Sequence, residues 1–115
     1  MAAVSRYTPN RGDVVWLTFI PQAGHEQAGH RPALVLSPAA YNSKTGLMVC
    51  CPITSRVKGY PFEVSINTSN IKGVVLADQV KSLDWQARKA RKKIKAPRRV
   101  LEETLGKLGA LLWSE

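Results

Sequence analysis

The sequence has 115 residues, which is enough for one domain, residues 1–115, with a single core. Hydrophobic residues make up 44% of the chain and charged residues 22%, a balance that excludes an intrinsically disordered protein. The net charge of +9 favours a polyanionic or acidic partner, and no apolar run approaches the roughly 18 residues of a membrane span.

Short apolar runs separated by turn residues indicate a mainly β protein. In the first predicted strand, Trp16 is expected to lie in the core, and residues 39–46 are expected to form a helical turn. Pro52 lies within the third strand and predicts an edge or a bulge, because proline donates no ladder hydrogen bond. The predicted strands are Asp13–Ile20, Pro32–Ser37, Leu47–Thr54, Phe62–Ile66 and Gly73–Val80.

The two cysteines, Cys50 and Cys51, are neighbours in the third predicted strand. Adjacent strand residues point to opposite faces of a sheet, so the two thiols are poorly placed to form a disulfide. No histidine or further cysteine lies near them at metal-ligand spacing. We therefore predict two free, buried or half-buried thiols.

Positive charge is concentrated near the C-terminal end of the chain. Residues 88–99 contain eight of the 17 basic residues and no acidic residue, while the other nine nearly balance the eight acidic residues. Residues 87–96 are so charged that they have little to bury, and they fit either a solvated helix or a basic edge strand. This segment is interpreted as a surface for a polyanion or an acidic protein, with a face kept for solubility as the alternative.

A C-terminal helix is predicted from Pro97 onward. Proline is favourable in the first turn of a helix. Leucines then recur at the spacing of one helical stripe, at positions Leu101, Leu105, Leu108 and Leu112. With the basic segment counted as a strand, the chain has about six strands and one C-terminal helix, which together predict a partly open β-barrel.

Residues His25–Pro32 read HEQAGHRP and follow a strand that begins with Gly12 and Asp13. This arrangement resembles the E-Q-x-G-x-R-P loop of the MazF/PemK family of type II toxin endoribonucleases. Further matching blocks follow in order over nearly the whole chain, which is closest to the MazF branch. These blocks are LVLSP at Leu34–Pro38, Tyr41–Asn42, PIT at Pro52–Thr54, KGYPFE at Lys58–Glu63 and GVVLADQVKS at Gly73–Ser82.

The resemblance implies a mainly β, SH3-like barrel with a C-terminal helix, assembled as a cytoplasmic homodimer with RNA in a groove at its interface. It implies cleavage of single-stranded mRNA at a short motif such as an ACA-like triplet, which inhibits translation and growth. The expected products carry a 2′,3′-cyclic phosphate and a 5′-hydroxyl, and no metal or other cofactor is expected. A MazE-like antitoxin with an acidic tail is the implied protein partner, through which DNA is contacted indirectly.

The resemblance assigns three catalytic positions: Arg31, Thr54 and Glu26. The planar guanidinium of Arg31 can bind two oxygens of the reacting phosphate, and it is a poor base because its pKa exceeds about 12. The Thr54 hydroxyl can donate to a phosphate oxygen. The pKa of Glu26 beside a phosphate should be raised, which suits a general base, although a role in orienting Arg31 or in loop solubility is equally open.

RNA contacts are assigned to further positions by the same resemblance. The amides of Asn42 and Gln79 offer both a donor and an acceptor to base edges, and an aromatic ring of Phe19 or Trp16 could stack on a splayed base. His25 and His30 titrate near neutral pH, but no second feature supports a paired-histidine ribonuclease. The predicted RNA-binding residues are Phe19, Gln27, His30, Asn42, Ser55, Lys58, Gln79 and Lys81.

Two other functions are compatible with a basic barrel of this size. One is a CcdB-like gyrase poison, which cuts nothing and needs no clustered arginine and threonine. The other is a noncatalytic RNA- or DNA-binding barrel that uses the basic segment. The E-Q-A-G-H-R-P loop together with Thr54 favours the ribonuclease.

Overall fold

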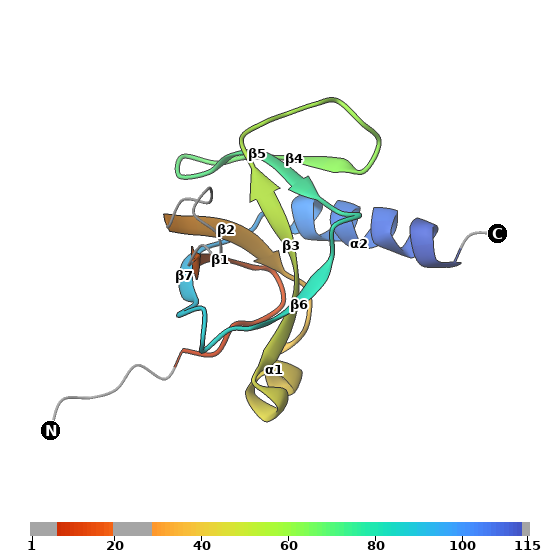
Figure 1. The fold of residues 1–115 in the computed structure, drawn as a ribbon. Coiled ribbons are helices and arrows are strands. Elements are labelled where there is room, and N and C mark those ends of the chain that lie inside the picture. Colours follow the sequence, from red (N-terminus) through yellow and green to blue (C-terminus); the bar gives the residue numbers. More distant parts are fainter. Residues whose placement is uncertain (1–6, 20–28, 114–115) are drawn as a thin grey trace, which may run out of the picture.

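A computed structural model describes residues 7–19 and 29–113 of the chain. Its strands curl into a partly open barrel, α1 projects from one end, and α2 lies beside β4 (Figure 1). The elements are β1 Asp13–Phe19, β2 Gly29–Val35, α1 Ala39–Thr45, β3 Leu47–Thr54, β4 Glu63–Asn67, β5 Lys72–Leu76, β6 Lys81–Asp84, β7 Arg91–Lys95 and α2 Arg98–Trp113. The predicted mainly β fold with a C-terminal helix is confirmed.

All strand pairs are antiparallel, and the order across the sheet is β4-β5-β3-β2-β1-β7. β3 also pairs with β6 over its first half and with β5 at its end. Pro52 therefore lies in a central strand, and the prediction of an edge is wrong. It lies just where the partner of β3 changes from β6 to β5, so the missing N–H interrupts neither of these two ladders.

Two strand predictions need correction. The predicted strand at residues 73–80 ends at Leu76, because residues 76–79 form a turn in which the Gln79 amide donates to the Leu76 carbonyl (3.1 Å). The short strand β6 that follows was not predicted, since its four residues are mostly polar. The basic segment contains β7, at one end of the strand order, so the edge-strand alternative is correct.

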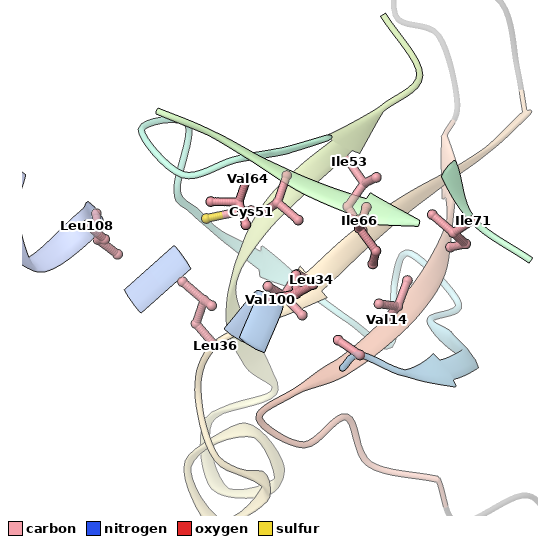
Figure 2. Packing of buried hydrophobic residues seen from close by; sticks show 12 residues of the cluster. Val14, Leu34, Leu36, Cys51, Ile53, Val64, Ile66, Ile71, Val100 and Leu108 are labelled. Atoms are coloured by element: carbon pink, nitrogen blue, oxygen red, sulfur yellow. The ribbon is translucent and has the colours of Figure 1, made fainter. Parts of the chain in front are cut away.

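The sheet buries apolar side chains on both faces. One cluster joins the barrel interior to α2 through Val100 and Leu108. Figure 2 shows Val100 among the side chains of the strands and Leu108 at the margin of the group. A second cluster on the other face includes Leu17, Cys50 and Trp85. Cys51 belongs to the first cluster and Cys50 to the second, so the prediction of two free, buried thiols on opposite faces is confirmed.

The predicted core position of Trp16 is only partly correct, and only part of the leucine stripe of α2 is buried. Trp16 is half-buried, and the Lys93 ammonium lies 5.7 Å from the centre of its ring. The buried face of α2 follows Val100, Thr104 and Leu108 rather than the whole leucine stripe. Leu105 and Leu112 are 38% and 59% exposed, so the described residues leave this part of the leucine stripe uncovered.

None of the described helices has the length and apolar character needed to cross a lipid bilayer.

Candidate active site

Two predicted catalytic residues lie at the same end of the β2–β3 pair. The last register partners toward this end are Ala33 of β2 and Pro52 of β3. Arg31 and Thr54 each lie two residues beyond this pair, Arg31 in β2 and Thr54 as the last residue of β3. Residues two apart in a strand project from the same face of the sheet. The guanidinium and the hydroxyl therefore leave the face on which Ala33 and Pro52 lie.

Arg31 lines a small cavity of about 120 Å³, here called the arginine cavity. Arg31 comes from β2, Lys81 from the start of β6, and Arg88 from the turn that precedes β7. The described lining contains no acidic side chain, and the remaining surface is largely apolar. It is formed by Leu17, Thr18, Pro32, Ala33, Cys50, Pro52 and Leu83. A cavity of this kind suits an anionic group attached to a flat, weakly polar one, such as a nucleotide.

Thr54 lines a second, more open cavity of about 400 Å³, here called the threonine cavity. Three residues predicted from the sequence meet there, since Lys58 and Gln79 line it with Thr54. The half-buried Tyr60 also lines it. The lining residues are Thr54, Arg56, Lys58, Tyr60, Glu63, Leu76 and Gln79.

The loop between β3 and β4 forms one wall of the threonine cavity and is held by specific bonds. The Glu63 carboxylate accepts hydrogen bonds from the backbone amides of Lys58 (2.9 Å) and Gly59 (2.8 Å). The Tyr60 hydroxyl donates to Asp78 (2.9 Å), and partial desolvation together with this bond raises the pKa of Tyr60. The Lys107 ammonium of α2 donates to the carbonyls of Pro61 and Glu63. The loop is thus fixed relative to the helix.

The end of β3 is held by close contact with a glycine. The Thr54 hydroxyl accepts a hydrogen bond from the Arg56 amide (3.1 Å), which leaves its own hydrogen available to a ligand. Gly73 of β5 has a φ of 154°, and a Cβ built there would lie 2.2 Å from the Thr54 carbonyl oxygen. A side chain at this position would displace Thr54, so the glycine is required for the local geometry.

Asn42 does not belong to this site, contrary to the prediction that it contacts RNA. Asn42 is a fully buried residue of α1. Its side-chain amide accepts a hydrogen bond from the Ser37 hydroxyl (2.6 Å) and donates to the carbonyls of Pro9 (2.7 Å) and Ser37 (3.0 Å). With its donors and acceptor already used, this amide offers no edge to a base.

The other predicted positions are distributed around the site. His30 is exposed on β2 opposite Thr18, and Ser55 is exposed immediately after Thr54. Phe19 ends β1, but its side chain is outside the described part of the chain, as are the predicted positions Glu26 and Gln27 and the weighed candidate His25. Sequence reasoning did not single out Arg56 or Arg88 as lining residues. Arg56 follows two residues after Thr54, a weak signal, and Arg88 was one member of the basic segment.

Comparison with known proteins identifies the family. A family model described as PemK-like, MazF-like toxin of type II toxin–antitoxin system matches residues 10–112. The chain belongs to this family. MazF, an endoribonuclease toxin of Escherichia coli K12, is 59% identical over 90 residues, which cover 78% of this chain and 81% of that protein. The endoribonuclease PemK of E. coli is 38% identical over 109 residues, covering 89% of this chain and 80% of PemK.

Solved structures of MazF/PemK proteins agree with this assignment. A MazE–MazF structure from Deinococcus radiodurans matches with a TM-score of 0.88 and 60% identity, covering 95% of this chain and 99% of that one. A structure of MazF from the same organism matches with a TM-score of 0.82 and 62% identity, covering 92% and 97%. The predicted family, fold class and enzyme class of endoribonuclease are confirmed. The roles of individual residues in this MazF/PemK chain remain predictions.

Proposed function

We propose that this toxin cleaves single-stranded mRNA without a metal ion, at a short motif of the ACA type, leaving a 2′,3′-cyclic phosphate and a 5′-hydroxyl. The observation that supports the proposal is that Arg31 and Thr54 lie at the same end of the β2–β3 pair and line two cavities that also contain Lys58, Lys81 and Arg88. This arrangement suits a phosphodiester held between a guanidinium and a hydroxyl.

Cyclisation requires stabilisation of the phosphorane charge. Arg31 supplies two parallel N–H donors for the nonbridging oxygens, and it keeps its charge throughout the reaction. Thr54 supplies a third donor, because its hydroxyl already accepts from Arg56 and can turn its hydrogen toward the phosphate. Preorganised donors of this kind lower the barrier because they need no reorientation as charge develops.

Proton transfer completes the reaction. The 2′-hydroxyl must lose a proton as it attacks phosphorus, and the departing 5′-oxygen must gain one. Glu26 is the proposed base for the first step, because a carboxylate near phosphate has a raised pKa. Metal-free chemistry is supported by the described lining residues, since the single carboxylate among them, Glu63, is already bonded to two backbone amides.

RNA recognition is proposed to use both cavities. Lys58 and Lys81 would neutralise phosphates, and Gln79 would read a base edge through its amide. His30 and Ser55 are exposed beside these cavities and would contact the backbone or a neighbouring base. Single-stranded RNA fits this arrangement because its unstacked bases can enter separate recesses.

A homodimer and a MazE-like antitoxin complete the proposal, together with action in the cytoplasm. The structures of MazE–MazF from D. radiodurans support such an antitoxin for this chain. Exposed apolar side chains of α2 support self-association, because exposed apolar surface marks protein interfaces. These side chains are Leu105, Leu111, Leu112 and Trp113.

The test is to incubate the purified protein with a long single-stranded RNA in excess EDTA and to map both ends of every fragment. Cuts at one short motif, with cyclic phosphate and 5′-hydroxyl ends, are the expected result. Intact RNA in EDTA with cleavage restored by Mg²⁺ would contradict metal independence. Intact RNA under both conditions would contradict the nuclease, and inhibition of gyrase would be measured next.

A further inference from the structure

The basic segment has become a defined surface, here called the basic edge: Arg88, Arg91, Lys92, Lys93 and Lys95 on β7 and the turn before it. β7 is the last strand in the sheet order, so one of its sides has no neighbouring strand in the described fold. All four cations of β7 are exposed, and Arg88 is half-buried.

A β-bulge determines where these cations point. The register of β7 with β1 shifts between Val14 and Val15, because Ile94 pairs with Val14 whereas Lys92 pairs with Val15. Lys93 is the extra residue. In a regular strand, the side chains of Lys92 and Ile94 would lie on the same face of the sheet. The bulge places them on opposite faces, so that Ile94 packs against the core while the Lys92 ammonium lies 3.7 Å from the Asp13 carboxylate. The Lys93 ammonium lies over the Trp16 ring.

The basic edge is continuous with the candidate active site. Arg88 lines the arginine cavity together with Arg31, and its carbonyl accepts a hydrogen bond from the Thr18 amide (2.8 Å). Lys92 is the partner of Val15 in β1 and Arg31 is the partner of Leu17, so these two side chains leave the same face of the sheet. Arg91 and Lys93 leave the opposite face, where Arg91 is the partner of Trp16 and Lys93 lies over its ring. Two strand spacings, roughly 10 Å, separate β2 from β7. RNA leaving the arginine cavity meets Lys92 first and reaches Arg91 and Lys93 by passing around the free side of β7.

Within the described residues, the ion pair of this surface joins Lys92 to Asp13, and the other cations of the basic edge have no such pair. The Asp13 side chain is 4% exposed and already accepts from the Tyr7 hydroxyl (2.7 Å) and the Asn10 amide (3.1 Å). Bulges and lysines on an edge strand hinder the addition of another strand. A partner must therefore be recognised through the cationic side chains rather than through the β7 backbone, which favours a phosphate backbone over an extended acidic peptide.

We propose that the basic edge is an exosite that binds the sugar–phosphate backbone of RNA nucleotides flanking the cleavage motif. This proposal rests on the proposed ribonuclease function. The exosite raises affinity for long RNA without reading sequence, because phosphate contacts position a nucleic acid and carry no base information.

The experiment compares Arg91→Gln/Lys93→Gln with the wild-type protein and with a matched control, Lys44→Gln/Arg98→Gln, which removes two exposed cations elsewhere. Lys92 is kept because it pairs with the buried Asp13. Each protein is assayed on two RNAs with the same motif, one carrying a single extra nucleotide on each side and one with long flanks.

For the long RNA, the edge variant should raise KM roughly 5- to 10-fold with kcat unchanged, and its binding should show a salt slope smaller by about 1.4, or about 0.7 for each lost phosphate contact. The short RNA and the control variant should show no change. An equal loss on both RNAs would overturn the exosite, as would unchanged RNA kinetics with weaker inhibition by the antitoxin.

Binding is also measured with a long RNA whose 2′-hydroxyl at the cut position is replaced by hydrogen, which cannot cyclise. The proposed function would be contradicted, and the exosite supported, if the wild-type protein cleaved neither of the two cleavable RNAs but bound the 2′-deoxy RNA more tightly than Arg91→Gln/Lys93→Gln does. The exosite alone would be contradicted if the wild-type protein cleaved RNA and the Arg91→Gln/Lys93→Gln variant bound the 2′-deoxy RNA as tightly as the wild type.

Discussion

Two regions of the molecule, around Asn42 of α1 and around the end of β3, contain polar residues that the sequence assigned to RNA binding or catalysis. The two regions differ in the burial and hydrogen bonding of these residues. In the α1 region, Asn42 is buried with its amide bonded to Ser37 and Pro9, and its carbonyl accepts from the Trp85 indole (2.8 Å). At the β3 end, Thr54 and Gln79 line an open cavity. Polar groups that satisfy one another stabilise the fold, whereas polar groups facing a cavity are available to a ligand. Substitutions in the two regions should therefore separate stability from catalysis.

Asn42→Ala is expected to have the largest effect, on stability. Its loss leaves the Pro9 and Ser37 carbonyls without their buried donor, which should lower the free energy of unfolding by roughly 3 kcal/mol. Urea denaturation followed by circular dichroism measures this change. Unchanged stability with a changed RNA motif would show that Asn42 reads bases after all.

Arg31→Ala should lower cleavage by about 100-fold or more, because the main charge stabiliser is removed, with stability close to the wild type. Single-turnover cleavage of a defined RNA gives the rate. Arg31→Lys is the control, and it should recover only part of the activity because an ammonium lacks the planar pair of donors. An alanine variant that cleaves at the wild-type rate would remove Arg31 from the mechanism.

Gly73→Ala should affect both stability and catalysis, because Gly73 packs directly against the backbone of Thr54. The new Cβ would collide with the Thr54 carbonyl, so we expect about 2 kcal/mol of destabilisation and displacement of Thr54. Cleavage should fall even at temperatures where the variant is fully folded. Gly46→Ala, with nothing within 4 Å of its Cβ but also a positive φ, is the control for backbone strain alone.

Thr54→Val should reduce cleavage by 10- to 100-fold, since one donor to the phosphate is lost while the shape is preserved. Thr54→Ser keeps the hydroxyl and should stay close to the wild-type rate. If serine and valine variants were equally impaired, the methyl group and not the hydroxyl would be what the site requires.

The smallest expected effect is a pH dependence of stability that comes from the two buried cysteines. Burial raises the pKa of Cys50 to about 11 and that of Cys51 to about 12, above the ordinary value of 9.0. The unfolded chain thus loses these protons first. The stabilisation is present below pH 9 and is lost as the pH rises through the folded values. Melting temperatures should fall over this range, and the fall should be shallower in Cys50→Ala/Cys51→Ala.

The sequence by itself determined a good part of this protein. Short apolar runs separated by turn residues predicted five of the seven strands, because a strand that packs on a core must carry apolar side chains between its turns. Leucine spacing predicted α2, and adjacency in a strand predicted that Cys50 and Cys51 face opposite ways. The order of matched blocks indicated the family and placed Arg31, Thr54, Lys58 and Gln79 among the site residues.

The tertiary structure decided the rest. Residue type did not separate Asn42 from Gln79, because both are amides in turn-rich segments and only packing shows which one is enclosed. The bulge at Lys93, the partner change at Pro52 and the contact of Gly73 with Thr54 depend on neighbouring strands that lie far away in the sequence. Local pattern fixes which elements form. Burial, and the meeting of Arg31, Lys81 and Arg88 in one cavity, depend on strand register, which is set by long-range pairing.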